Sequence, residues 1–138
     1  MFSRLMKIVC ILILLQVPVL ISGCSGDADD GPKMVTVKGT VSFDGKPIRL
    51  GNMIFEPADG AGRTSAGEIK EGDFEFQSPL GLKKVIISAS RKTGKKGKEF
   101  GEDKMESYIP EKYNTKSELT ENVQADAENV FHFELQSK

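Results

Sequence analysis

The chain has 138 residues, and its 19 lysines and arginines against 20 aspartates and glutamates give a formal net charge of −1. This balance gives no global electrostatic support for binding nucleic acid, which requires an excess of basic residues. The length suffices for a single domain. Glycine is frequent and no long 3.6-residue periodicity occurs, so we expect an all-β domain built from short strands.

The N-terminal segment has the layout of a bacterial lipoprotein signal peptide. Basic residues at positions 4 and 7 precede an apolar run of 14 residues, Ile8 to Ile21, and Ser22-Gly23-Cys24 follows. We predict cleavage between Gly23 and Cys24 and a diacylglyceryl thioether on Cys24. A membrane-spanning helix needs about 20 apolar residues, so an uncleaved anchor is the weaker alternative. An ordinary secretory peptide is the other.

Removal of residues 1–23 would leave 115 residues with 17 basic and 20 acidic side chains, a net charge of −3. Cys10 would be discarded, so Cys24 would be the remaining cysteine and no disulfide could form within one chain. Residues 24–33 are then the lipidated cysteine and a polar tether. Residues 34–138 are the folded domain, which we expect outside the cytoplasm, on the periplasmic face of a membrane or on the cell surface.

Seven short strands are predicted in the domain, because apolar and polar residues alternate between turn signals rich in Gly, Pro and Asp. Such spacing is typical of a two-sheet antiparallel sandwich. Phe74 and Phe76 share one face and are expected in the core. The strand that starts at Leu82 is apolar on both faces and should be the most central. The predicted strands are residues 34–43, 48–56, 64–69, 74–76, 82–90, 119–123 and 130–135.

Residues 91–106 are polar and glycine-rich, and we predict a long loop. Its first half carries five basic residues, which could form a patch for anionic glycans or phospholipid headgroups. The alternative is a solvated protrusion whose charges compensate one another, since acidic residues fill the second half. The candidate patch consists of Arg91, Lys92, Lys95, Lys96 and Lys98, and the compensating acids are Glu99, Glu102, Asp103 and Glu106.

The residues do not suggest an enzyme. His132 is the only histidine, and it falls between two inward-facing aromatics, so it should face water. One exposed histidine forms neither a metal site nor a triad, and no set of residues indicates a cofactor. A Lys–Asn isopeptide bond would need Lys38, Asn129 and Glu75 together, but Lys38 and Glu75 alternate with inward residues and should point outward.

The order of several short motifs resembles that of transthyretin-like, carboxypeptidase-regulatory-like β-sandwich domains. The opening of the domain carries this likeness in Val37–Val41, Asp44–Ile48 and Ile54–Pro57. The ending, Ile109–Asn114 and Asn129–Leu135, is similar to the small planctomycete-type lipoproteins that carry this domain. The likeness extends over nearly all of residues 34–135.

This resemblance implies a prealbumin-like, Ig-like sandwich of about seven strands with a non-catalytic role. Lys83 occupies a position where relatives usually carry an aromatic residue, which implies a less buried start of that strand. Together, the residues and the resemblance predict a lipid-anchored structural or protein-interaction module of the cell envelope. The alternative is a carbohydrate- or anion-binding module that uses the 91–106 loop. The expected partners are the membrane, through the lipid, and an envelope protein or glycan, and not nucleic acid.

Overall fold

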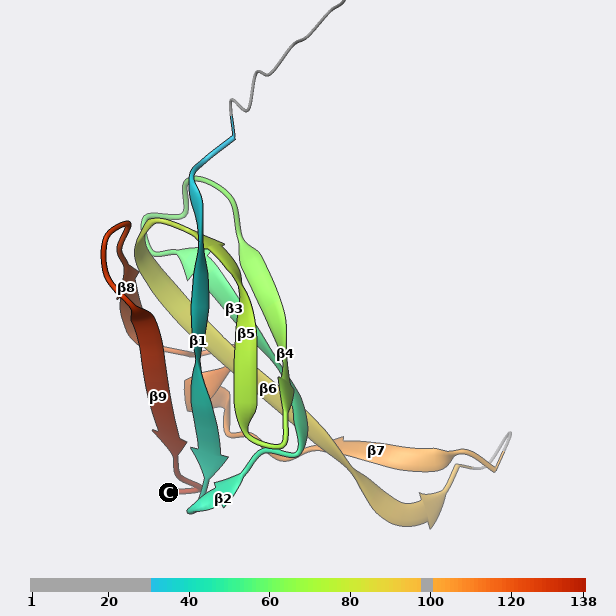
Figure 1. Ribbon diagram of the computed structural model, residues 1–138. Coiled ribbons are helices and arrows are strands. Elements are labelled where there is room, and N and C mark those ends of the chain that lie inside the picture. The colour runs from blue at the N-terminus through green and yellow to red at the C-terminus, as the bar shows by residue number, and fades with distance from the viewer. Residues whose placement is uncertain (1–30, 98–100) are drawn as a thin grey trace, which may run out of the picture. The chain divides into compact units, whose positions relative to one another are not determined.

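Nine β-strands and one short 3-10 helix make up the part of the chain that the computed structural model describes, residues 31–97 and 101–138 (Figure 1). This part contains no α-helix, which confirms the predicted all-β class. The predicted signal peptide, Cys24 and Lys98 lie outside the described residues. The strands are β1 (Met34–Phe43), β2 (Lys46–Pro47), β3 (Leu50–Pro57), β4 (Ser65–Lys70), β5 (Asp73–Pro79), β6 (Gly81–Lys96), β7 (Asp103–Ser107), β8 (Thr120–Val123) and β9 (Asn129–Leu135), and the helix is η1 (Glu111–Tyr113).

The strands form one strongly curled sheet in the order β9-β1-β5-β4-β3-β6-β8. β2 pairs with the end of β1, and β7 pairs with the second half of β6. Neighbours are antiparallel with one exception, because β9 runs parallel to β1. The expected antiparallel arrangement therefore needs correction at the last strand.

Two-residue turns shape this sheet at the hairpins β1–β2 and β4–β5. Asp44 and Gly45 have φ values of 49° and 76°, and Glu71 and Gly72 have 48° and 92°. Positive φ at both central residues gives a turn whose twist matches that of the flanking strands. The second turn is also fixed from outside, because the Gly72 N–H donates to the Ile48 carbonyl at 2.8 Å.

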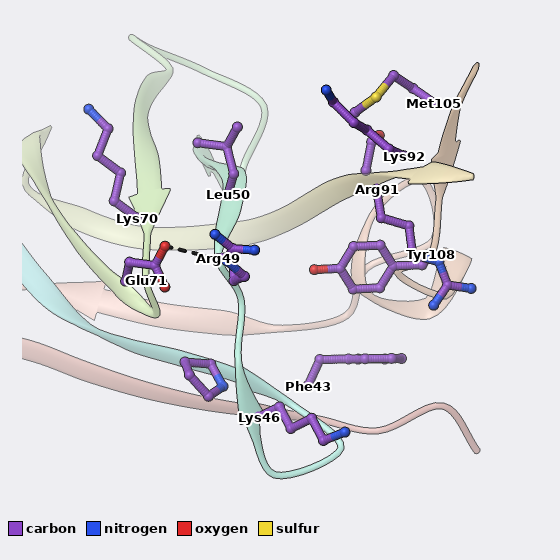
Figure 2. A pocket seen from close by; sticks show the side chains of 12 residues that line it. Phe43, Lys46, Arg49, Leu50, Lys70, Glu71, Arg91, Lys92, Met105 and Tyr108 are labelled. Atoms are coloured by element: carbon purple, nitrogen blue, oxygen red, sulfur yellow. Dashed lines mark ion pairs between the residues drawn. The ribbon is translucent and has the colours of Figure 1, made fainter. Parts of the chain in front are cut away.

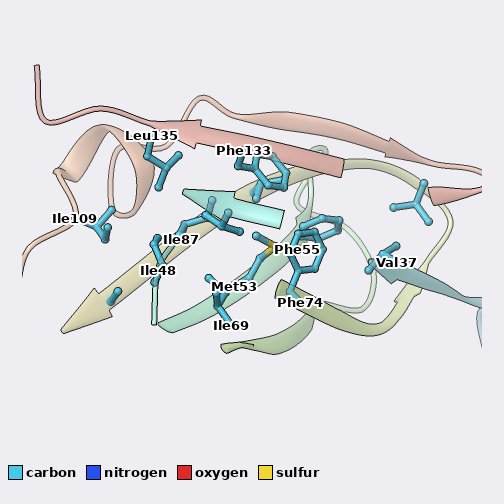
Figure 3. Packing of buried hydrophobic residues seen from close by; sticks show 14 residues of the cluster. Val37, Ile48, Met53, Phe55, Ile69, Phe74, Ile87, Ile109, Phe133 and Leu135 are labelled. Carbon is cyan, nitrogen blue, oxygen red and sulfur yellow. The ribbon is translucent and has the colours of Figure 1, made fainter. Parts of the chain in front are cut away.

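The core lies inside the curl, where the alternating apolar residues meet (Figure 3). β4 pairs with β5 only next to their turn, at Ile69–Phe74 and Lys70–Asp73, so the sheet bends sharply at this hairpin. Buried side chains from β1, β5 and β9 join those from β3, β6 and β8 in one core cluster. The buried apolar residues are Val37, Val41, Ile48, Met53, Phe55, Ile69, Phe74, Val85, Ile87, Ala89, Ile109, Val123, Phe133 and Leu135.

Two glycines let neighbouring groups approach closely. A Cβ on Gly39 would lie 1.7 Å from the Phe131 carbonyl oxygen on β9. A Cβ on Gly67 would lie 2.2 Å from the Phe76 ring, which covers β4 at this point. Phe76 and Phe131, both predicted to point inward, are half-buried rather than fully buried and pack against the fully buried Phe55.

Lys83 contradicts the expectation of a less buried strand start, since it is only 3% exposed on the inward face of β6. Lys83 makes no hydrogen bond or ion pair through its side chain with the described residues, and no buried side-chain nitrogen among them lacks a partner. Its ammonium group therefore reaches water while the aliphatic stem is buried. A lysine stem here supplies the burial that an aromatic residue was expected to supply.

Candidate functional site

Residues 91–106 are not the loop that the sequence predicts. β6 continues to Lys96 and pairs with β7 to form a two-stranded ribbon that projects from the sheet (Figure 1). The ladder runs through Arg91–Glu106 and Lys92–Met105, and its register shifts before Lys96–Asp103. The ribbon lacks the apolar alternation of a core strand, and the pairing is held by backbone hydrogen bonds with little side-chain burial.

The acidic residues of the ribbon neutralise most of its basic ones. Lys92 and Lys96 lie 2.8 Å and 3.9 Å from the carboxylate of Asp103, and Arg91 lies 3.7 Å from that of Glu106. The hydrogen bond to Asp103 raises the pKa of Lys92. Among the described residues of the candidate patch, Lys95 alone forms no ion pair. The five predicted residues thus do not form one uncompensated basic cluster.

The clearest concave surface instead lies where the ribbon leaves the sheet (Figure 2). This groove has a volume of about 860 Å³, within the range of ligand sites in proteins. Its walls come from the β1–β2 turn region, the start of β3, the end of β4 and the root of the ribbon. The lining residues are Phe43, Lys46, Pro47, Arg49, Leu50, Lys70, Glu71, Ser90, Arg91, Lys92, Met105 and Tyr108.

The floor of the groove is apolar and partly rigid. Phe43 and Tyr108 meet edge to face with ring centroids 5.5 Å apart, and the Arg91 guanidinium lies 5.6 Å above the Tyr108 ring. Burial raises the pKa of Tyr108, although Arg91 opposes the shift. Leu50 and Met105 are 55% and 53% exposed, which is unusual for large apolar side chains. The floor therefore offers open apolar area beside a fixed aromatic pair.

The rim of the groove is mainly basic. Five lining residues are lysine or arginine, and Glu71 is the one acidic residue among them. Glu71 lies 3.5 Å from Arg49, and Lys70 lies 2.8 Å from Glu68, outside the lining. These pairs are exposed, and exposed pairs contribute about 0–1 kcal/mol. A carboxylate on a ligand could therefore replace them at little cost.

Of the patch residues that the structure describes, Arg91 and Lys92 line this groove, and Lys95 borders a smaller hollow on the ribbon. The sequence reasoning missed Lys46, Arg49 and Lys70 on the rim. It also missed the floor, although one signal was present. Met105 is a large apolar residue within an otherwise polar segment, as an exposed contact residue would be.

The remaining predicted residues are far from forming a chemical site. His132 is exposed as predicted, and its Nδ1 lies 2.9 Å from the Thr40 hydroxyl. Asn129 is buried, and its side chain bonds the backbone of Gln124 and Ala127. Lys38 and Glu75 are exposed cross-strand neighbours, as their phase predicts. Among the described residues, no three His, Cys, Asp or Glu side chains converge as metal ligands would.

Comparison with protein-family models, curated proteins and solved structures finds no match to this chain. In the described part, no helix has the length and apolar character to cross a membrane.

Proposed function

We propose that the chain is a lipid-anchored module of the cell envelope that acts through protein interaction and not through catalysis. The anchor rests on the sequence, where Ser22-Gly23-Cys24 follows a charged start and a short apolar run. The interaction role is carried by the groove, an open apolar floor with a basic rim and no convergent acid–base pair. The predicted extracytoplasmic location follows from the anchor.

We further propose that the curled sheet is a transthyretin-like sandwich. Its support is the β4–β5 hairpin, which pairs only beside its turn and leaves two sets of strands facing each other across the core. The strand motifs that resemble this family fall on β1, β3 and β9, and β9 returns beside β1. This reading gives the domain a rigid framework on which the groove is held.

The position of the groove suits an anchored module. The tether enters the domain at Met34, at the start of β1, and Phe43 at the end of β1 lines the groove (Figure 1). The nine residue steps between these points span roughly 30 Å at about 3.3 Å per residue. The proposed lipid-bearing tether would thus join the domain at one end of β1, and the groove lies at the other end.

The alternative function, a carbohydrate- or anion-binding module, keeps one observation in its favour. Arg91 stacks on Tyr108 beside Lys92, and a basic rim around an aromatic ring can bind an acidic sugar. Its weakness is that an anion has the basic groups alone to bind, and these carry exposed ion pairs with Asp103 and Glu106 that any acidic ligand must displace.

The anchor is tested by replacing its thiol. Cys24→Ser should remove incorporation of labelled palmitate and move the protein from the membrane to the soluble fraction of the producing cells. Ser22→Thr, which keeps Cys24, is the matched control. A Cys24→Ser protein that stays in the membrane pellet at the wild-type processed mass would contradict the proposed anchor.

A further inference from the structure

One edge of β6 has no partner strand beside the groove. β3 pairs with β6 only as far as Gly51–Ala89, and among the described residues β7 alone pairs with β6 beyond Ser90. The Tyr108 N–H donates to the Ala89 carbonyl, so the backbone groups of Ala89 point toward β7. Alternation then turns the N–H and C=O of Ser90 and Lys92 to the opposite edge. The Gly51–Ala89 pair already engages the Ser90 N–H on that edge, and no described strand pairs with the Ser90 C=O or with Lys92 there. Such an edge is a template for another strand.

This edge and the apolar floor belong to the same groove. Ser90 and Lys92 line it together with Leu50 and Met105 (Figure 2). Four large apolar side chains in the described part are exposed, and two of them, Leu50 and Met105, line this groove. A strand added to β6 would lay alternate side chains against this floor.

The charges of the rim favour an acidic occupant. Five basic side chains and one carboxylate line the groove, and the carboxylates that pair with Lys70, Arg91 and Lys92 lie outside the lining. When those three acids are included, the excess falls to one positive charge. The electrostatic attraction for an acidic ligand is therefore weak and local. The unpaired edge of β6 and the apolar floor must supply most of the specificity for the ligand.

We propose that the groove binds an extended acidic segment of a partner protein, which adds as a strand to the unpaired edge of β6 at Ser90–Lys92. The inference rests on the proposed function and names the surface and the chemistry of the partner. A peptide supplies backbone hydrogen bonds, apolar side chains and carboxylates together. An anionic glycan or a lipid headgroup would use the basic rim and leave the edge unpaired.

The test uses the full chain held in nanodiscs of zwitterionic lipid, so it does not depend on how the N-terminal segment is processed. The probe is a labelled heptapeptide, Glu-Val-Glu-Phe-Glu-Val-Glu, and its fluorescence anisotropy is measured at low salt. We expect saturable binding with a Kd below about 1 mM. A peptide with Lys in place of Glu should not bind, and N-methylation at alternate residues should weaken binding at least tenfold. No binding by the acidic peptide overturns the inference, and so does binding that is unchanged by N-methylation of each of the two alternate sets in turn.

Variants of the chain locate the site. Leu50→Ser with Met105→Ser should weaken peptide binding about tenfold, whereas Leu82→Ser should not, although Leu82 is also 55% exposed. Lys46→Glu should weaken binding more than Lys38→Glu, which changes the net charge equally on an exposed face outside the groove. Thermal unfolding of each variant verifies that it is folded. Equal effects of the groove and control substitutions overturn the inference.

The same variants separate the other ligand classes. Heparin and phosphatidylglycerol vesicles serve as probes for an anionic glycan and a lipid surface. The groove is assigned to anions if the peptide does not bind, one of these probes does, and that binding is weakened by Lys46→Glu but not by Leu50→Ser. This result overturns the inference. Palmitate labelling of Cys24 is measured separately, so a failed peptide test does not touch the anchor and a failed anchor does not touch the groove.

Discussion

From Gly81 to Ala89, β6 pairs with β3 and, at its start, with β8, whereas from Ser90 to Lys96 the same strand is paired in register with β7. In the first half every second side chain is buried, and in the second half nearly all are exposed. The first half is stabilised by apolar burial and the second by its ladder and weak ion pairs. A single strand can thus belong to the core along one half and provide an open surface along the other.

The largest expected loss of stability follows substitutions of core residues in the buried half of β6 and in the strands around it. Phe55→Ala on β3 removes a fully buried ring that packs against Phe76 and Phe131, and should cost about 3–5 kcal/mol. Chemical denaturation measures this loss. Phe131→Ala should cost less, because Phe131 is half-buried. Equal losses at the two positions would contradict the distinction.

Gly72→Ala should have the next largest effect, because Gly72 closes the turn beside the groove. Its φ is +92°, and an added Cβ would lie 2.6 Å from the Pro47 Cβ. The left-handed conformation alone costs roughly 1–2 kcal/mol for a non-glycine residue, and the contact adds to it. Gly45→Ala is the matched control, since Gly45 also has positive φ but has open space around it. Denaturation that finds Gly45→Ala more destabilising would count against the contact.

The sequence predicts the buried half well, for a physical reason. Val85, Ile87 and Ala89 alternate along the strand, and their burial confirms an inward face. The prediction of the most central strand is wrong, because β6 lies next to the end of the strand order. The turns at Asp44-Gly45 and Glu71-Gly72 were equally predictable, because few residue pairs tolerate positive φ. The ribbon was not predictable in this way, since its pairing leaves no apolar period to detect. The groove was missed because it joins residues from four segments.

The ribbon should tolerate the loss of its ion pairs. A double-mutant cycle with Lys92→Ala and Asp103→Ala should give little or no coupling energy, since the pair is open to solvent. Hydrogen exchange should also be faster in β7 than in β3, because little side-chain burial protects the ribbon. Protection in β7 equal to that in β3 would show that the ribbon is stabilised in some other way.

The smallest effect concerns Glu121, which faces Lys83 across the β6–β8 pair. Burial raises the pKa of Glu121 in the folded protein. Above its folded pKa, Glu121 is ionised in a partly buried site, and this destabilises the folded state. Below the unfolded pKa of about 4.3, the side chain is protonated in both states and the destabilisation is absent. Glu121→Gln should raise the Tm slightly at pH 7 and not at pH 3. Exposed Glu118→Gln is the control, and a gain that persists at pH 3 would contradict burial as the cause.

The parallel pairing of β9 with β1 has a consequence for how the chain folds. His132 and Thr40, hydrogen-bonded across this pair, are 92 positions apart. Closing so long a loop is entropically expensive, and such non-local contacts slow folding. The sheet cannot be completed until β9 has been synthesised and has returned to β1.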